Sequence, residues 1–482
     1  MKNQKLLNTK IYDVLNILSK GVDFDDYSVQ EEVCFGYNFK YYKGALTNAN
    51  GLEDLSIRVS STSANVKTLS LALPSKIFAY SSVVLNKSSI LAMDIYNNLY
   101  KNDVDSFSSE FTKITQFDSL PNIIKISTLN ENFVLFSSAS KLNVYSGGYG
   151  LKTIDSSCKI LDVCMHNGVM FLIKDQEVRH IINWFPDINP DNIPINIMTA
   201  NSIAIPDDCG NIIKILSFND YLYVFCEYGI FRVVSYESKK KQYVEPVYMG
   251  SSRIFPQTIA LSGGDIIFTS ESGIYSFSGL KVEKIDVKIS SLLNGVDNSN
   301  AKAVFGNDKY YLACKLNYAD NKVVGAEDGG YVNNTLLVVD TENKSVVINR
   351  GICLKDLSTY FGYENHKIMC VSKRYSPALK QICENGKHET DYPLKKKCVI
   401  SQMTFGDINS TKVIKRIFVK TNALLQVNFE GDKYLKTLTI KPSDCIQNIP
   451  VNIKGKVFNV SVECEKSEIK VDALKLQVGE YA

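Results

Sequence analysis

Residues 219–234 read NDYLYVFCEYGIFRVV, and a closely similar pattern returns 44 residues later in residues 263–279, GGDIIFTSESGIYSFSG. In both segments a polar turn precedes an apolar run, and a second turn leads to another run rich in aromatic and aliphatic residues. When the two segments are aligned, Glu227 falls on Glu271. Self-similarity at such a distance is the sequence signature of a repeat architecture.

The two segments belong to a longer series of units that share one form. Each unit predicts a strand, a polar turn, a more apolar second strand, another turn and a third strand. The starts of the units lie roughly 36–57 residues apart, which is the spacing of propeller blades and similar repeats. The units are residues 76–100, 122–147, 159–184, 211–236, 255–285, 301–320 continued by 334–349, and a degenerate seventh at 358–375.

This series predicts a β-propeller of six or seven blades at residues 76–390. A single blade cannot bury both of its faces, so several blades stack radially around a channel. The second strands are near-continuous apolar runs, as a strand enclosed between neighbouring blades requires. A plain β-sandwich would show a cleaner alternation of apolar and polar residues.

The ends of the chain have a different character. Residues 33–57 break at Lys43-Gly44 and turn at Asn50-Gly51, which predicts two strands with a hairpin or an open loop between them. The apolar spacing of residues 7–18 predicts one short amphipathic helix. Residues 391–482 predict several clearly alternating strands, as in an antiparallel sheet or small sandwich.

The sequence therefore predicts an all-β protein with three regions. These are an N-terminal arm and β-hairpin region at residues 1–75, the propeller, and a C-terminal β-sandwich-like domain at residues 391–482. We expect the terminal regions to form the additional antiparallel sheet or sandwich.

Composition narrows the function classes. Hydrophobic residues make up 45% of the 482 residues and charged residues 22%, as in a globular protein, and a net charge of +3 does not argue for a nucleic-acid or membrane binder. The 12 Cys residues lie far apart without a CxxC pair, which favours reduced core residues in a reducing cytoplasm. Neither a secretory signal nor a run of about 20 apolar residues is present.

Catalytic and metal-binding patterns are scarce. The chain contains no HExxH, GxSxG, P-loop or EF-hand motif. Cys158, Cys164 and His166 have spacings of six and two, which do not suit a tetrahedral metal site. The acidic pairs Asp25-Asp26 and Asp207-Asp208 could serve a glycosidase, but carboxylates are common in loops. We therefore expect neither an enzyme nor a cofactor, and no catalytic or metal-binding residues.

Basic residues supply the candidate contact sites. Lysines on a solvated strand edge discourage edge-to-edge pairing, and that is the plainer interpretation. The functional alternative is a non-specific contact with a DNA backbone or with an acidic neighbouring subunit. The candidates are Lys239, Lys240, Lys241, Lys395, Lys396, Lys397, Lys415 and Arg416.

Several segments together resemble the propeller-bearing tail-nozzle and tail-hub (head–tail connector) proteins of short-tailed bacteriophages. The resemblance covers about residues 33–320 and depends on the order and pattern of segments. It includes a Trp beside an Asn-Pro loop, here Trp184 and Asn189-Pro190. The segments are NFKYYKGALTNANGLEDL (38–55), CMHNGVMFLIKDQEVRHIINWFPDINPDNIP (164–194), YLYVFCEYGIFRVV (221–234), RIFPQTIALSGGDIIFTSESGIYSFSGLKVEKI (253–285) and FGNDKYYLAC (305–314).

This resemblance implies a structural virion protein of the phage tail, assembled in the cytoplasm of the bacterial host. Subunits of such nozzles form a ring, usually of six, below the portal and adaptor rings, and the stacked channels carry DNA out at infection. The implied partners are further copies of the chain, the portal, adaptor and other tail proteins, and, transiently and without specificity, viral DNA.

Two other functions stay open at this point. One is a soluble propeller scaffold or a carbohydrate- or protein-binding module that works as a monomer, and the other is a cryptic hydrolase. About 75 residues precede the first blade and about 90 follow the last, a surplus that favours contacts between subunits. We expect deletion of residues 390–482 to leave a folded propeller that no longer forms rings.

Overall fold

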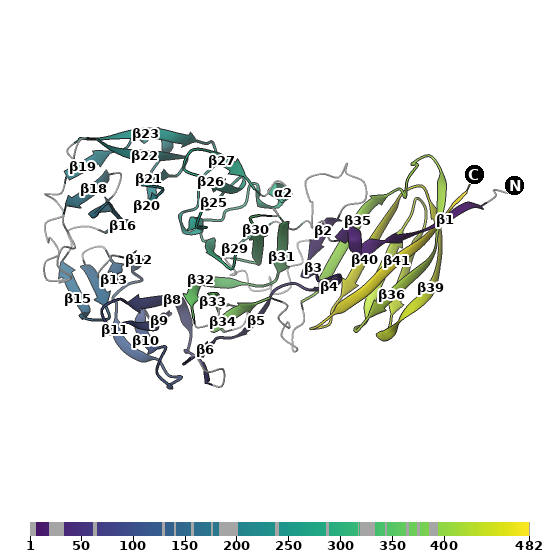
Figure 1. The fold of residues 1–482 in the computed structure, drawn as a ribbon, viewed down its shortest axis with the longest axis horizontal. Coiled ribbons are helices and arrows are strands. Elements are labelled where there is room, and N and C mark those ends of the chain that lie inside the picture. The colour runs from purple at the N-terminus through teal and green to yellow at the C-terminus, as the bar shows by residue number, and fades with distance from the viewer. Residues whose placement is uncertain are drawn as a thin grey trace.

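Seven four-stranded antiparallel sheets stand around a central channel and form a β-propeller, and a two-sheet sandwich lies beside it (Figure 1). The structure is a computed structural model. It describes residues 6–18, 33–60, 65–127, 131–138, 141–155, 159–174, 177–182, 201–236, 241–285, 289–316, 318, 333–342, 345–362, 366–373, 376–384 and 394–481.

The first six blades are each built from four strands that follow one another in the chain. Blade 1 consists of β8 (Pro74–Ser82), β9 (Lys87–Asp94), β10 (Asn98–Asp103) and β11 (Thr112–Gln116). Blade 2 consists of β12 (Asn122–Ser127), β13 (Asn132–Ser137), β14 (Lys141–Ser146) and β15 (Gly150–Asp155). Blade 3 consists of β16 (Asp162–His166), β17 (Val169–Lys174), β18 (Glu177–Ile182) and β19 (Asn201–Ala204).

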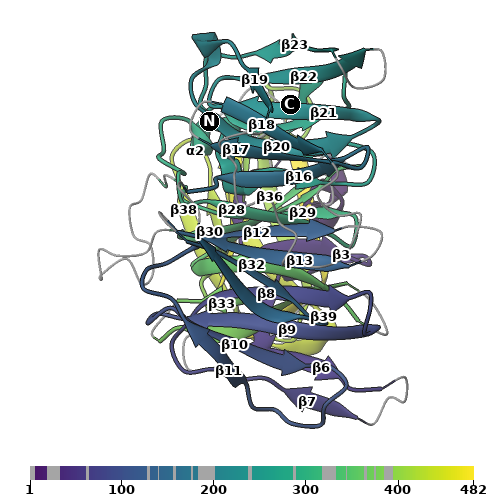
Figure 2. The same ribbon diagram turned by 90° about the vertical axis from the view of Figure 1, so that its left-hand side faces the viewer.

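Blades 4 to 6 repeat this pattern, and the first strand of each blade faces the channel. Blade 4 consists of β20 (Ile212–Phe218), β21 (Tyr221–Cys226), β22 (Gly229–Tyr236) and β23 (Lys241–Met249). Blade 5 consists of β24 (Ala260–Leu261), β25 (Ile266–Ser270), β26 (Gly273–Phe277) and β27 (Val282–Lys284). Blade 6 consists of β28 (Lys302–Gly306), β29 (Lys309–Cys314), β30 (Thr335–Asp340) and β31 (Ser345–Arg350). Figure 2 shows several of these strands from the side, running through the thickness of the ring.

Blade 7 is assembled from two distant parts of the chain. Its inner three strands are β32 (Leu354–Phe361), β33 (His366–Ser372) and β34 (Ala378–Cys383), and its outermost strand is β5 (Gly51–Asp54). Leu52 lies opposite Ile382 in this pairing. The N-terminal strand therefore closes the ring. The predicted fold class is confirmed, with seven blades, and the seventh sequence unit is degenerate because its outer strand comes from elsewhere.

The hairpin turns explain why polar pairs recur in the sequence. Asn219 and Asp220 have φ angles of 48° and 63°, and Asn307 and Asp308 have 50° and 58°. Two consecutive residues with positive φ match the twist of a two-residue hairpin, and Asn and Asp tolerate this conformation. The strand that follows such a turn is enclosed between blades, and Leu222 to Cys226 in β21 are at most 1% exposed.

The repeated Glu has a structural role in blades 4 and 5. The backbone N–H of Glu227 donates to the carbonyl of Asn211 (2.9 Å), and its carboxylate accepts the N–H of Asn211 (3.1 Å). Glu271 makes the same two contacts with Arg253, at 3.0 and 3.3 Å. The Arg253 guanidinium also pairs with Glu227 (2.9 Å), which joins the two blades. The Glu that recurs in the sequence therefore has the same role in both blades, which is to hold the backbone of a residue that precedes the inner strand.

The sandwich contains strands from both ends of the chain. One sheet has six strands: β1 (Leu6–Asp13), β3 (Phe39–Tyr42), β4 (Ala45–Asn48), β36 (Thr411–Thr421), β39 (Ser443–Gly455) and β41 (Lys470–Tyr481). The other has five: β2 (Val33–Tyr37), β35 (Lys396–Met403), β37 (Leu425–Glu430), β38 (Leu435–Ile440) and β40 (Phe458–Cys464). Buried residues such as Ile417, Phe429, Phe458 and Leu476 fill the space between them.

The N-terminal region contributes strands to three larger sheets, and β3 and β4 form a β-hairpin that turns at Lys43-Gly44. Its first four strands belong to the sandwich, β5 belongs to blade 7, and β6 (Ser56–Arg58) pairs with β7 (Val66–Thr68). The helix predicted at residues 7–18 is largely wrong, because β1 pairs along β41 and only α1 (Val14–Leu18) is helical. An isolated helix this short is unstable in water, whereas a sheet edge offers a continuous ladder of hydrogen bonds.

Short helices and a polar junction complete the described chain. The short helices are η3 (Asp207–Cys209), η4 (Pro256–Thr258) and α2 (Ser290–Leu293). Asn38, which is buried, joins the sandwich to blade 6 through its N–H to Ile348 O (2.8 Å) and its amide to Arg350 O (3.0 Å). Among the helices of the described residues, none has the length and apolar character needed to span a bilayer.

We predict that Leu52→Asp weakens the closure of the ring. Leu52 is half-buried against the cluster between blades 6 and 7, and an unpaired carboxylate there costs about 2 kcal/mol. The β34 amides should therefore exchange hydrogen faster, by the factor that corresponds to a loss of about 2 kcal/mol in the free energy of opening. Glu53→Gln, on the exposed side of the same strand, should leave their exchange unchanged; equal protection in both variants would refute the closure role.

Candidate functional site

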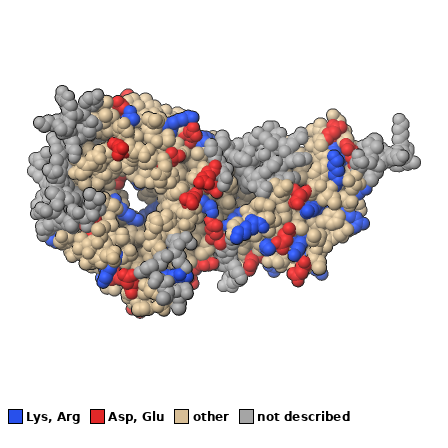
Figure 3. All heavy atoms as spheres, in the orientation of Figure 1, with Lys and Arg blue, Asp and Glu red and all other residues tan. Residues whose placement is uncertain are grey.

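The channel of the propeller is a concave site at the centre of the ring of blades. It holds a cavity of about 600 Å³ that is lined by residues from all seven blades. Figure 3 shows the opening at the centre of the ring, with basic side chains in its wall. Because every blade contributes its inner strand or the residues just before it, the site exists only when the ring is closed.

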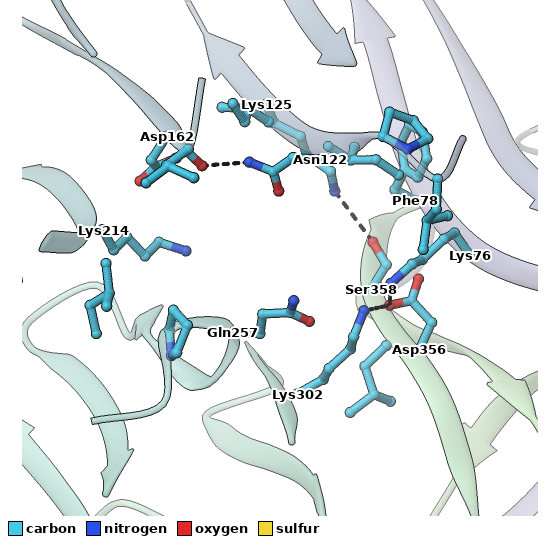
Figure 4. A pocket seen from close by; sticks show the side chains of 18 of the residues that line it. Lys76, Phe78, Asn122, Lys125, Asp162, Lys214, Gln257, Lys302, Asp356 and Ser358 are labelled. Atoms are coloured by element: carbon cyan, nitrogen blue, oxygen red, sulfur yellow. Dashed lines mark hydrogen bonds and ion pairs between the residues drawn. The ribbon is translucent and has the colours of Figure 1, made fainter. Parts of the chain in front are cut away.

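Each blade contributes at least one polar side chain from its inner strand or from the residues just before it, and we call seven of these, one from each blade, the channel ring. They comprise four lysines, two aspartates and one glutamine, and the close-up shows them around one cavity (Figure 4). In order from blade 1 to blade 7, the members are Lys76, Lys125, Asp162, Lys214, Gln257, Lys302 and Asp356. A further lysine, Lys159, lies just before β16 and lines the same cavity.

Asp356 neutralises one side of the channel ring. Its Oδ1 lies 2.6 Å from the Nζ of Lys302 and 4.0 Å from that of Lys76, and its Oδ2 accepts the N–H of Ile77 (2.9 Å). These contacts join blade 7 to blades 6 and 1. Burial disfavours the charged form of Lys302, but the nearby Asp356 outweighs burial and raises the pKa of that lysine. Burial lowers the pKa of Lys76.

Asp162 has a related role between blades 3 and 4. Its Oδ2 accepts the backbone N–H of Ile215 (3.0 Å), as Asp356 accepts that of Ile77. Burial raises the pKa of Asp162, while Lys214 and the N–H of Ile215 act in the opposite direction. Both carboxylates of the channel ring therefore hold the next blade in place through its backbone.

On the opposite side of the channel ring, the lysines that line the cavity have no ion pair with a described residue. No ion pair joins Lys125, Lys159 or Lys214 to another residue of the described ranges. The Nζ of Lys125 lies 3.4 Å from the Ser358 hydroxyl and 5.5 Å from the centre of the Phe78 ring. Burial is the main reason that the pKa of Lys125 is lowered to about 8; Asp356 opposes this shift, and Lys214 contributes to it. The channel can thus attract anions more readily than cations.

The predicted basic residues do not meet at one site. Lys239 and Lys240 lie outside the described residues, and Lys241 begins the outermost strand of blade 4. Lys415 and Arg416 lie on β36 of the sandwich, where Lys415 contacts the Thr9 hydroxyl (3.4 Å) and Arg416 contacts Asn448 (3.1 Å). Their role in binding DNA or a neighbour stays a prediction.

The run at 395–397 is divided by the alternation of the strand. Lys395 and Lys397 both pair with Glu463, at 2.8 and 3.0 Å. Lys396 points the other way and is fully buried, with its Nζ donating to the carbonyls of Leu394 (3.3 Å) and Lys466. Burial lowers the pKa of Lys396 to about 8. Three consecutive lysines here do not make a continuous basic surface.

Sequence reasoning missed the lysines that line the channel. They stand singly in the sequence, so a search for basic runs passes over them. A usable signal was nevertheless present, because NIIK occurs at residues 122–125 and again at 211–214, and its lysines are Lys125 and Lys214. An alignment of the inner strands of the units would have placed these lysines at one level of the channel.

The residues considered above as metal ligands make structural contacts where the structure describes them. His166 is buried, and its Nδ1 lies 2.9 Å from the Ser217 hydroxyl. Burial raises the pKa of the neighbouring Cys164 thiol to about 12, and Cys158 and Asp25-Asp26 lie outside the described residues. Among the residues that the structure describes, no three His, Cys, Asp or Glu side chains cluster as metal ligands would.

Comparisons with known proteins bear on the fold alone. No family model matches the chain, and no curated protein matches it. A crystal structure of BBS1N in complex with ARL6DN, soaked with mercury, is 10% identical and covers 70% of this chain and 98% of its own, with a TM-score of 0.42. A crystal structure of the mitotic checkpoint complex is 8% identical and covers 65% and 90%, with a TM-score of 0.40. Similarities this weak carry no argument about function.

We predict that Lys125→Met stabilises the protein at pH 7 and that this gain shrinks at higher pH. The folded pKa of Lys125 is about 8, below the value of about 10.4 in an unfolded chain. Below pH 8 the lysine is charged in both states and its burial is fully unfavourable; between pH 8 and 10.4 the folded protein sheds the proton first, so wild-type stability recovers.

Urea unfolding at pH 7 and pH 9.5 measures the effect. The difference in unfolding midpoint between wild type and Lys125→Met should fall between the two pH values. Lys441→Met, at an exposed position, should show no such change with pH. A Lys125→Met difference that stays constant would mean that Lys125 does not titrate in this range.

Proposed function

We propose that the chain is a structural, non-enzymatic subunit of a ring in a phage tail nozzle or connector, and that a second copy of the chain binds the free edge of its sandwich. Three points support the proposal. The order of segments resembles such tail proteins, the propeller provides a rigid wall, and the sandwich has an open edge with exposed apolar side chains.

The observation that carries the proposal is the edge formed by β38 and β39. These strands end the two sheets on the same side of the sandwich, because Lys436 on β38 donates to the carbonyl of Val451 on β39, and Gln447 donates to that of Lys441 (2.7 Å). Within the described chain, each of the two pairs with another strand on one side only. Figure 1 places β39 on the side of the sandwich away from the propeller.

Large apolar side chains are exposed along this edge. Tyr434 is 63% exposed, Leu435 73% and Ile446 59%. Proteins usually protect open edges with charges, prolines or bulges, since unpaired N–H and C=O groups invite another strand. Lysines and Pro450 limit indiscriminate pairing here, but the apolar side chains favour burial against a partner.

A second copy is the partner that this edge suits best. A contact between this edge and a different surface of the next copy is heterologous, and heterologous contacts close into rings when the rotation between copies allows it. Pairing through an open strand edge supplies main-chain hydrogen bonds, and the neighbouring apolar side chains supply buried area.

The channel of a single propeller is not the proposed path for DNA. Its cavity of about 600 Å³ has the volume of a small-molecule site. In the proposed ring, DNA would pass through the larger opening between subunits. Transient and non-specific contacts with DNA by basic residues, including Lys415 and Arg416, are part of this proposal.

A binding module is the second candidate function, and the channel favours it. A closed propeller with a basic cavity could act as a monomer without any ring. The two functions differ in the state of the purified protein, because a ring subunit associates through its sandwich edge and a monomeric module does not.

We predict that Leu435→Lys combined with Ile446→Lys prevents ring formation without unfolding the protein. Both side chains face solvent in the single chain, so charges there cost little stability but oppose burial against a neighbour. Mass photometry and negative-stain images should show wild-type rings with a central hole and monomers of the double variant. Far-UV circular dichroism should be the same for both.

Leu280→Lys is the matched control, because Leu280 is 78% exposed on the propeller. This variant should still form rings. A wild-type protein that stays monomeric at high concentration and when mixed with a purified portal–adaptor complex would contradict the ring proposal. The deletion of residues 390–482 is a poorer test than the sequence suggested, because it also removes strand partners of β1, β2 and β4.

A further inference from the structure

We infer that the channel of the propeller binds a small molecule that carries two or more phosphate groups. The inference rests on the placement of charges around the cavity and does not depend on the formation of a ring. The channel ring and Lys159 together contribute five lysines and two aspartates to one cavity.

The two aspartates do not balance the lysines that remain. Asp356 forms an ion pair with Lys302 (2.6 Å) and accepts a hydrogen bond from the backbone of blade 1. Asp162 accepts the N–H of Ile215 and also interacts with the charge of Lys214. Lys125, Lys159 and Lys214, from three successive blades, thus face the cavity without an ion pair to any described residue.

Gathering like charges in a partly desolvated cavity is unfavourable unless an anion joins them. Burial disfavours the charged form of Lys125 most, and the nearby Lys214 adds to this effect while Asp356 opposes it. A bound anion removes the repulsion and restores the solvation that burial takes away. A polyanion in the cavity would therefore offset the unfavourable burial of the Lys125 charge.

The walls of the cavity indicate the class of anion. Lysine ammonium groups bind phosphate as point charges and do not require the fixed geometry of an arginine fork. The amide of Gln257 and the hydroxyl of Ser358 line the cavity as neutral hydrogen-bonding groups, and Phe78 and Pro256 add apolar surface. A volume of about 600 Å³ suits a small molecule rather than a folded partner.

The spacing of the lysines around the ring favours more than one phosphate group. Lys125 and Lys214 enter the cavity from blades 2 and 4 (Figure 4), and Lys159, just before the first strand of blade 3, lines the same cavity. A single phosphate group would meet one or two of them, whereas a chain of phosphates can meet all three. We therefore commit to a polyphosphorylated small molecule, with inorganic tripolyphosphate as the simplest probe.

Isothermal titration calorimetry of the full-length protein with tripolyphosphate at pH 7 tests the inference. We expect one site per chain in wild type. Lys125→Gln combined with Lys214→Gln should weaken binding at least about tenfold, since each lost charge contact in a partly buried site is worth on the order of 1 kcal/mol or more. Thermal unfolding of the double variant checks that the ring is intact.

The control variant is Lys281→Gln combined with Lys441→Gln, which removes the same charge from exposed positions on the propeller and the sandwich. It should bind tripolyphosphate within about twofold of wild type. No binding to wild type at millimolar tripolyphosphate, equal losses in the two double variants, or full binding by a folded Lys125→Gln/Lys214→Gln variant would each overturn the inference. A short single-stranded oligonucleotide that competes better than tripolyphosphate would also overturn it, because the ligand would then be nucleic acid.

Discussion

The pairing of β5 with β34 is the contact on which the rest of the structure depends. A blade is stable in this architecture only when both of its faces are covered, and blades 1 and 7 cover each other only if the ring is closed. A strand of four residues, Gly51–Asp54, supplies that closure. The same closure brings Asp356 of blade 7 against Ile77 of blade 1, so the channel and its charges exist because the ring is shut.

The seven inner strands then act as a scaffold for side chains that are far apart in the sequence. Every blade contributes at least one polar residue to the lining of the cavity, and the two aspartates hold backbone N–H groups of the next blade. Lys302 and Lys76 lie against Asp356, whereas Lys125, Lys159 and Lys214 form no ion pair with a described residue. The carboxylates thus join blades, whereas these lysines face a cavity. This difference makes the channel a candidate binding site.

The blades could be predicted because their strands and turns depend on residues that are close together in the sequence. An enclosed second strand such as β21 must be apolar throughout, and a hairpin turn such as Asn219-Asp220 must tolerate positive φ, so both leave clear marks in the sequence. The ends could not be predicted in the same way. Nothing within Gly51–Asp54 indicates that its partner is Lys380–Cys383, and nothing within residues 7–18 indicates that β41 will provide an edge. The channel lysines likewise come together at one cavity only when the blades are placed side by side.

The sharing of the sandwich between the two ends of the chain has a consequence for the order of folding during synthesis. β5 can find its partner as soon as β34 has been made, so the propeller can close while the last hundred or so residues are still being added. β1 and β4 must wait for β41, the last strand of all, and β2 must wait for β35. The first strands to leave the ribosome are therefore among the last to be paired, and until then Phe39 and Leu46 lack the core that covers them in the finished protein.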